Sequence, residues 1–235
     1  MKTVGILGGM GPDATVLLMQ KIIAGTKAHD DCDHIPIICH QNTQVPSRIK
    51  RILEKSGEDP TPVLQRMAVD LQMMNCDFLA MPCNTAHYYY QDIYKNVKIP
   101  ILNMIDLAAK KLAGLGLSKI GILASPAVKK IAIFDESFIN YGLESRFSQD
   151  EDGMLTLIKN IKKGTIDDFT IKSFEEQVSQ LMARKCDGIL IACTELSFLR
   201  THISSDLACL DSLDCLTEEI ISLATQGDTE IVREI

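Results

Sequence analysis

The chain has 235 residues, 46% of them hydrophobic, which is enough for one large domain or two smaller ones with separate cores. A net charge of −7 offers no positive surface for nucleic acid or anionic lipid, and no apolar run approaches the roughly 20 residues of a membrane helix. Glycine and proline interrupt the first apolar residues too early for a signal peptide, so we expect a cytoplasmic protein whose eight cysteines are reduced.

The N-terminal segment predicts a buried strand that turns directly into a helix. Residues 3–7 form the strand, residues 8–12 a tight glycine turn, and residues 13–27 the helix. Glycines in such a turn let backbone amides approach a ligand, and the start of a helix attracts an anion. The turn matches neither the dinucleotide-binding motif nor the phosphate-binding loop. By itself it is therefore as typical of a plain strand-to-helix connection as of a ligand-binding turn.

A second strand is predicted at residues 35–39, followed by a polar loop at 41–48. Arg48 in this loop is a candidate for holding a carboxylate, because its guanidinium fork matches two oxygens, although a lone arginine is more often solvated. No metal site is predicted, since no common zinc spacing fits the nearby side chains Cys32, His34, Cys39 and His40.

Two stretches of the chain are almost alike. Each begins with Cys-Asp, continues as a short apolar run, and ends in a cysteine, Cys83 in the first and Cys193 in the second. Such a run bounded by turn formers predicts a buried strand, and Asn84, Thr85 and Thr194 are residue types that begin helices. Each cysteine is therefore predicted to lie where a strand ends and a helix begins. A histidine four residues after the first cysteine, at position 87, suggests a thiol–histidine pair as one option.

The rest of the chain continues to alternate strands and helices, which is typical of parallel α/β sheets. Strands are predicted at residues 99–103, 119–124 and 206–210. Helical segments are predicted at residues 62–74, 84–95, 106–115, 131–141, 153–161, 170–185 and 217–225. The tail at 226–235 is expected to be peripheral.

Three segments of the first half recur in the second half, in the same order. Residues 3–7 recur at 119–123, the Cys83 stretch recurs at Cys193, and 101–106 recurs at 209–214, with offsets of 116, 110 and 108 residues. Three matches in register predict two homologous halves, each a small parallel sheet wrapped by helices. Ligands of such sheets bind beyond the carboxyl ends of the strands, so two facing halves would enclose one site with a cysteine on each wall.

Two opposed thiols suit one kind of chemistry. Removing a proton from the carbon next to a carboxylate, and returning it on the opposite face, needs two bases on opposite sides. One cysteine must start as a thiolate, although an ordinary thiol has a pKa of about 8.5. The start of a helix favours the thiolate through its partial positive charge. Asn84, Thr85 and Thr194, with nearby backbone amides, are predicted to bind the substrate carboxylate and to stabilise enolate-like charge.

The chain resembles the aspartate/glutamate racemase superfamily, most closely its aspartate racemases. The motifs that carry this resemblance are Gly8-Gly9-Met10-Gly11-Pro12, Asn42-Thr43-Gln44, Pro82-Cys83-Asn84-Thr85-Ala86-His87 and Cys193-Thr194-Glu195. The resemblance spans almost the whole chain and implies a pyridoxal-independent amino-acid racemase, usually dimeric, of two pseudo-symmetric α/β domains with the active site in the cleft between them. It implies domains at 1–102 plus 208–235 and at 103–207, because the C-terminal segment of the family returns to complete the first domain.

The resemblance also implies roles for individual residues. Cys83 and Cys193 match the two catalytic thiols, and Arg48 matches an arginine that binds the side-chain carboxylate. Lys162 best matches a second carboxylate-binding lysine, with Lys163 as the neighbouring alternative. Three further members of the matching motifs are predicted to contact the substrate: Met10, Gln44 and Glu195.

One turn departs from the family pattern. The family usually has a Thr-Gly-Thr-like turn after the strand at 119–124, and this chain has Ser125-Pro126-Ala127. Ser125 is predicted to supply the hydroxyl, and the changed turn leaves substrate size and preference open.

Racemisation without a cofactor is the function that these features favour, because both cysteines are kept. Aspartate is the first candidate substrate, since Arg48 and a lysine would hold its second carboxylate; glutamate or a broader range of amino acids is the alternative. Two other classes of protein stay open: a non-catalytic small-ligand binding protein, and a thiol redox pair, whose Cα atoms would lie within about 7 Å.

Overall fold

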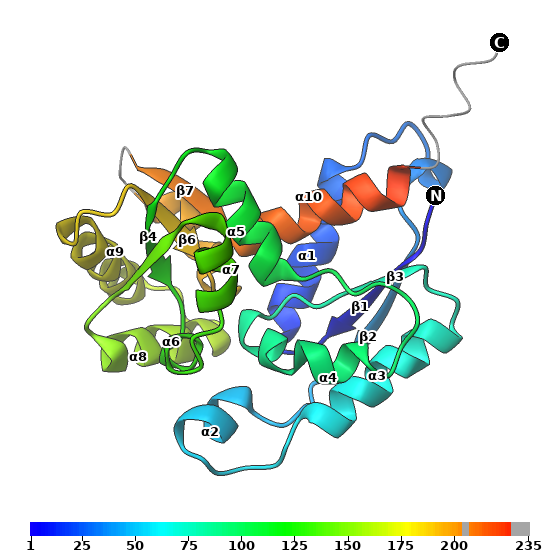
Figure 1. Ribbon diagram of the computed structural model, residues 1–235, viewed down its shortest axis with the longest axis horizontal. Helices are drawn as coiled ribbons and strands as arrows, with labels where there is room; N and C mark the ends of the chain where they lie inside the picture. The colour runs from blue at the N-terminus through cyan, green and yellow to red at the C-terminus, as the bar shows by residue number, and fades with distance from the viewer. Residues whose placement is uncertain (204–206, 227–235) are drawn as a thin grey trace.

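The computed structural model describes residues 1–203 and 207–226, and these form two parallel β-sheets with helices around each (Figure 1). In the first sheet, β1 (Val4–Gly8) lies between β2 (Ile37–Gln41) and β3 (Phe78–Ala80). The second sheet has the order β5-β4-β6-β7, and all its neighbours are parallel. Its strands are β4 (Lys119–Leu123), β5 (Glu144–Phe147), β6 (Gly188–Ile191) and β7 (Ala208–Asp211). The predicted fold class, two small parallel-sheet α/β units, is confirmed.

Helices connect the strands in both halves. The first half contains α1 (Pro12–Gly25), the short 3₁₀ helix η1 (Asp31–Asp33), α2 (Arg48–Leu53), α3 (Thr61–Met73), the 3₁₀ helix η2 (Asn84–Tyr89) and α4 (Tyr90–Tyr94). The second half contains α5 (Met104–Gly114), α6 (Pro126–Lys130), α7 (Asp135–Tyr141), α8 (Glu151–Lys162), α9 (Asp168–Ala183) and the 3₁₀ helix η3 (Leu196–His202). The last helix is α10 (Ser212–Thr225). Among the described residues, no helix is long and apolar enough to cross a bilayer.

Strand β1 is buried on both faces, which explains its unbroken apolar sequence. On one face Leu7 packs into a cluster with Leu64 and Leu71 of α3. On the other face, Ile6 packs into a cluster with residues of α1 and α10, such as Leu18 and Leu216. The sheet is therefore the middle layer of the first half, and its strand ends carry the loops that face the second half.

The turn after β1 requires glycine. Gly9 has φ +92°, and a Cβ atom on it would lie 2.3 Å from the carbonyl oxygen of Asn42. The backbone N–H of Gly9 donates to Oγ1 of Thr15 on α1 at 2.9 Å. The start of α1 is thus fixed against the end of β1, and it presents the turn to the neighbouring half.

The two halves repeat one topology. In each, a central strand lies between two parallel neighbours, with β1 and β4 in equivalent places and β3 and β6 equivalent beside them. The third predicted pair also matches, because Ile101 forms a bridge with Leu79 of β3 much as β7 pairs with β6. In both halves this segment ends in the N-cap residue of a helix. The Asn103 side chain accepts hydrogen bonds from backbone amides of α5, and the Asp211 side chain accepts one from the backbone amide of Leu213 on α10.

The C-terminal segment is divided between the two halves. We predicted that residues 208–235 join the first domain, but β7 pairs with β6, so residues 208–211 lie in the second sheet. Helix α10 instead runs back across the molecule and packs against α1 and α5 (Figure 1). Its apolar face completes the core of the first half. The remaining domain boundaries stay a prediction.

Several predicted elements differ in detail. The strand expected at 99–103 is a single bridge at Ile101, because only one residue there pairs with β3. The helix expected at 84–95 begins as the 3₁₀ helix η2 and becomes α-helical only at Tyr90. Strand β5 and helix α2 were not predicted from the sequence pattern. Residue 206 of the strand expected at 206–210, and the tail from 227 to 235, lie outside the described residues.

Candidate active site

Cys83 and Cys193 line the same small cavity between the two halves. Cys83 follows β3 and is the N-cap residue of η2, and Cys193 lies two residues after the end of β6. Both stand beyond the carboxyl ends of parallel strands, and both are free thiols. Six other predicted site residues line this cavity, namely Met10, Arg48, Thr85, Ser125, Lys162 and Glu195.

The two cysteine loops are joined directly across the boundary between the halves. The Thr194 hydroxyl donates to the carbonyl oxygen of Pro82 at 3.3 Å, and this bond is buried. Each partner is next in sequence to one of the two cysteines, so the bond holds the two loops at a fixed separation. Thr194 therefore positions the cavity wall rather than lining it.

Cys193 lies beside a carboxylate and a lysine. Its Sγ donates to Oε2 of Glu195 at 3.1 Å, and Nζ of Lys162 lies 3.1 Å from Oε1 of the same side chain. Burial, followed by the Glu195 carboxylate, raises the pKa of the Cys193 thiol well above its ordinary value. Lys162 opposes this effect without cancelling it. Cys193 is therefore protonated in this arrangement.

Lys162 carries its charge in the cavity wall. Burial alone would lower the pKa of Lys162, but the Glu195 carboxylate, and then Cys193 and Cys83, outweigh it, so the pKa is raised. Its side chain is 40% exposed, which keeps the ammonium within reach of a ligand. Of the two candidate lysines, Lys162 lines the cavity and forms the ion pair, whereas Lys163 is exposed at the C-cap of α8.

Arg48, the first residue of α2, is held by backbone carbonyls. Its guanidinium donates to the carbonyl oxygens of Val45 and Pro46 at 3.3 and 3.1 Å, and to that of Met10 at 3.3 Å. Its Nε is buried without a partner. Among the described residues, no carboxylate forms an ion pair with Arg48. The guanidinium is thus fixed in position while its charge is uncompensated, which suits an anionic ligand.

The buried Ser125 hydroxyl also faces the cavity without a hydrogen-bond partner. Ser125 is the N-cap residue of α6, yet its side chain accepts no hydrogen bond from that helix. A buried hydroxyl without a partner is uncommon in folded proteins. It is therefore available to a molecule bound between the cysteines.

His87 does not pair with the Cys83 thiol. Its Nδ1 lies 2.9 Å from the carbonyl oxygen of Cys83, and its Nε2 accepts from the backbone N–H of Met104 at 3.1 Å. Burial lowers the pKa of His87, so the ring is neutral. The thiol–histidine option was therefore wrong: His87 fixes the backbone around Cys83 and links it to the start of α5.

Two other predicted residues do not line the cavity. Asn84 is buried behind the cysteine, where its side-chain amide donates to the Ser212 hydroxyl at 3.0 Å. Gln44 is exposed, and its amide contacts the neighbouring Thr43 hydroxyl at 3.4 Å. Conversely, Ile49 and Ile158 line the cavity and were not predicted. Ile158 lies one helical turn before Lys162 on the same face of α8, a spacing that could have identified it.

The cysteine cavity is small and leads to a larger one. Its volume is about 30 Å³, which is room for about two water molecules. An adjacent cavity of about 350 Å³ is lined by the turn after β1 and by parts of α2 and α8. Four residues line both cavities: Met10, Arg48, Lys162 and Glu195. These four side chains therefore form the border between the cysteines and the wider space.

Comparisons with known proteins relate this chain to amino-acid racemases. Residues 7–220 match the model of the Asp/Glu/hydantoin racemase family. The broad-specificity amino-acid racemase RacX of Bacillus subtilis is 26% identical over 227 residues, covering 93% of this chain and 96% of that protein. The aspartate racemase of Picrophilus torridus superposes with a TM-score of 0.85 and 29% identity, covering 95% of this chain and 94% of that one.

A more distant relative shares the fold alone. A glutamate racemase of Francisella tularensis superposes with a TM-score of 0.69 at 13% identity, covering 97% of this chain and 82% of that one. The family model spans nearly the whole chain, including both cysteine stretches. The chain is an enzyme of the Asp/Glu/hydantoin racemase family.

Proposed function

We propose that this enzyme racemises aspartate without a cofactor, by proton transfer between the α-carbon and two cysteines, Cys83 and Cys193. One observation carries the proposal: two free thiols from opposite halves line a single cavity together with the cations of Arg48 and Lys162. Both cysteines are free rather than joined in a disulfide, as a pair of proton-transferring thiols must be. A binding protein would have no need of two sulfurs there.

The environment of Cys193 suggests which thiol starts protonated. Because Glu195 and burial favour the thiol form of Cys193, Cys83 acts as the base in the direction that begins from this state. The Cys83 thiolate takes the α-proton, and the Cys193 thiol returns a proton to the opposite face. The products are a Cys83 thiol and a Cys193 thiolate, and the opposite enantiomer reacts from that state. Lys162 then stabilises the negative charge on Cys193.

Aspartate is proposed because the cavity wall carries two cations on different elements. Arg48 on α2 has no carboxylate partner among the described residues and can bind the side-chain carboxylate. Lys162 on α8 can bind a carboxylate once it leaves Glu195, or can share its charge between the two. Two negative groups on the substrate would then be matched by two positive groups on the enzyme.

Broader specificity is the alternative, and Glu195 is the observation that favours it. In the free enzyme this carboxylate already neutralises Lys162 at 3.1 Å. A substrate with a neutral side chain would leave that ion pair intact, and Arg48 would bind the α-carboxylate. The similar protein RacX of Bacillus subtilis is named a broad-specificity amino-acid racemase.

Deuterium exchange tests the proposal directly. The purified protein is incubated with L-aspartate in heavy water without pyridoxal phosphate. We expect deuterium at the α-carbon and formation of D-aspartate, and we expect Cys83→Ser and Cys193→Ser each to abolish racemisation. Cys209→Ser is the matched control, because that free cysteine on β7 is not part of the cavity wall. Binding of aspartate without exchange would overturn the proposal.

Parallel assays with L-glutamate and L-alanine separate the two specificities. Aspartate specificity predicts exchange with aspartate well above that with alanine, whereas broad specificity predicts similar rates. Assembly as a homodimer and a cytoplasmic location are further proposals, and size-exclusion chromatography with light scattering tests the first.

A further inference from the structure

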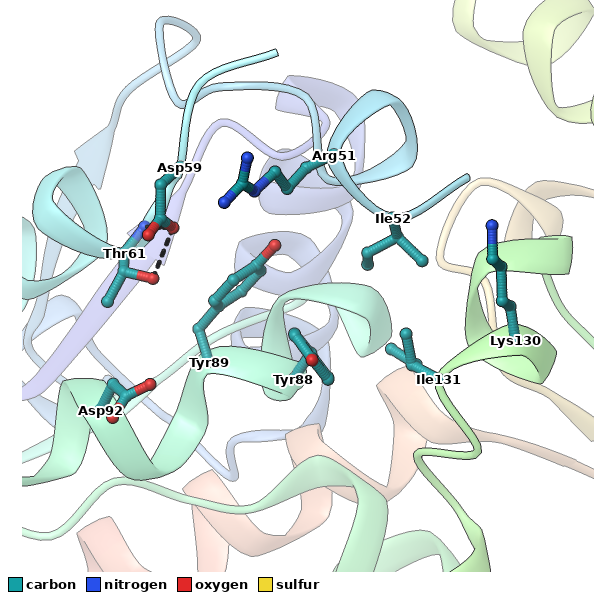
Figure 2. Close-up of a pocket in the computed structure, with 9 residues that line it drawn as sticks. All are labelled: Arg51, Ile52, Asp59, Thr61, Tyr88, Tyr89, Asp92, Lys130 and Ile131. Atoms are coloured by element: carbon teal, nitrogen blue, oxygen red, sulfur yellow. Dashed lines mark hydrogen bonds between the residues drawn. The ribbon is translucent and has the colours of Figure 1, made fainter. Parts of the chain in front are cut away.

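A third cavity, of about 720 Å³, lies on the boundary between the two halves and is lined by neither cysteine. Figure 2 shows the residues that line it. In the first half they come from α2, η2, α4, the start of α3 and the segment before it, and in the second half from α6 and the residue after it. They are Arg51, Ile52, Asp59, Thr61, Tyr88, Tyr89, Asp92, Lys130 and Ile131. We call it the seam cavity.

Two hydrogen-bond donors in the seam cavity lack an adequate acceptor. Tyr89 is only 6% exposed, and its hydroxyl is buried without a partner. The Arg51 side chain extends toward that hydroxyl in Figure 2, and its one hydrogen bond among the described residues is a long contact of 3.5 Å to the carbonyl oxygen of Gly57. A buried hydroxyl left unpaired is costly, so a native structure that keeps one needs an explanation.

Among the described residues, no group accepts a hydrogen bond from the Tyr89 hydroxyl. Asp59 is the nearby carboxylate, but its Oδ1 already accepts from the amide and the hydroxyl of Thr61 at 2.9 and 2.6 Å. Figure 2 shows Asp59 beside Arg51, with its hydrogen-bonded oxygen turned toward Thr61. An oxygen of a bound anion could accept from both Arg51 and Tyr89, as a carboxylate or a phosphate does.

We propose that the seam cavity binds a small oxyanion, a carboxylate or a phosphate, through Arg51 and the Tyr89 hydroxyl, and that its binding alters racemisation. The second part rests on the proposed function, whereas the first does not. Tyr88 is 56% exposed and forms an aromatic wall beside the site, with Ile52 and Ile131 as apolar neighbours. A ligand with an apolar part attached to its anionic group therefore fits this cavity.

Three short elements connect the seam cavity to the cysteines. Helix α2 carries Arg48 at its start and Arg51 one turn later, and η2 follows Cys83 and ends at Tyr89. Helix α6 begins after Ser125 and ends at Lys130, whose Nζ donates to the carbonyl oxygen of Leu53 at 3.0 Å across the boundary. A ligand that repositions Arg51 thus acts on the helix that holds Arg48, about one turn away.

Phosphate binding tests the site without reference to activity. The chain has five tyrosines and no tryptophan, so its fluorescence comes from tyrosine, and two of the five, Tyr88 and Tyr89, line the seam cavity. Wild type is titrated with inorganic phosphate, and in a second series with acetate, at constant ionic strength. We expect saturable binding of at least one anion, weakened about tenfold or more in Arg51→Gln and about fivefold in Tyr89→Phe. Arg66→Gln, which alters an exposed arginine paired with Asp70 on α3, is the control and should bind normally.

The outcomes show which anion class binds, which cavity binds it, and whether binding alters activity. Stronger binding of phosphate or of acetate identifies the anion class, and either result supports the site. Binding that survives Arg51→Gln but is lost in Arg48→Gln would assign the anion to the cysteine cavity and overturn the proposal, as would no binding at all. In the activity arm, the bound anion should change the rate of deuterium exchange about fivefold or more in wild type and Arg66→Gln, but not in Arg51→Gln. Binding with an unchanged exchange rate would overturn the coupling.

Discussion

Glu195→Gln should shift the pH dependence of racemisation in a predictable direction. The Glu195 carboxylate accepts from the Cys193 thiol at 3.1 Å and, after burial, is the main reason why the pKa of that thiol is raised. A glutamine keeps the size and a hydrogen-bond acceptor but removes the negative charge. A hydrogen bond to a charged group contributes about 1.5–3 kcal/mol, which corresponds to a fall of about one to two pH units in the pKa of Cys193.

The assay is the exchange rate measured separately from L- and D-aspartate as a function of pH. In the direction that begins with a Cys193 thiolate, the rise in rate with increasing pH should move about one to two units lower in Glu195→Gln. In the opposite direction, which needs the Cys193 thiol, the fall in rate at high pH should move lower by a similar amount. Glu151→Gln is the control, because that carboxylate pairs with Lys129 on the exposed surface. If both directions keep the wild-type profile, Glu195 does not set the protonation of Cys193 and the reasoning is refuted.

Three further predictions follow from the contacts around the cavity. Arg48→Lys removes the guanidinium group that three backbone carbonyls hold in place, so the KM for aspartate should rise about tenfold or more while the KM for alanine changes less. Steady-state kinetics check this, with Arg66→Lys as the control. Gly9→Ala should lower the free energy of unfolding by more than Gly116→Ala in urea denaturation, because both glycines have positive φ but only Gly9 would place a Cβ against backbone, 2.3 Å from Asn42; equal losses would exclude the clash. His87 is buried and neutral, with its pKa lowered by burial, so its contribution to stability is present above the pKa of about 6.5 in the unfolded chain and is lost as the pH falls below that value. The free energy of unfolding should therefore fall more steeply toward pH 5 in wild type than in His87→Gln. Parallel curves for the two proteins would contradict this.

The strand ends were predictable from the sequence because burial leaves a plain signal there. A parallel strand buried on both faces is a continuous apolar run, and the runs before Cys83 and Cys193 stop at residues that begin helices. The repeat of that pattern also predicts that the two thiols belong to equivalent places in two halves. Both line one cavity in the folded chain.

Other parts of the site depend on packing between residues distant in sequence. Nothing local distinguishes Asn84, which turns inward to Ser212, from Thr85, which lines the cavity. The pairing of β7 with β6 was also beyond local signals, since the same strand could extend either sheet. Helix α2 is only six residues long, too short for its apolar spacing to distinguish a helix from a loop.

The return of α10 to the first half has a consequence for synthesis of the protein. The core beside β1 contains Leu213, Leu216 and Ile220, which are among the last residues that the ribosome adds to the described chain. Until they emerge, the apolar faces of β1 and α1 lack their cover, even though every strand of that sheet is already complete. The N-terminal half should therefore stay open on the ribosome, depend on chaperones longest, and close only after the second half has been made.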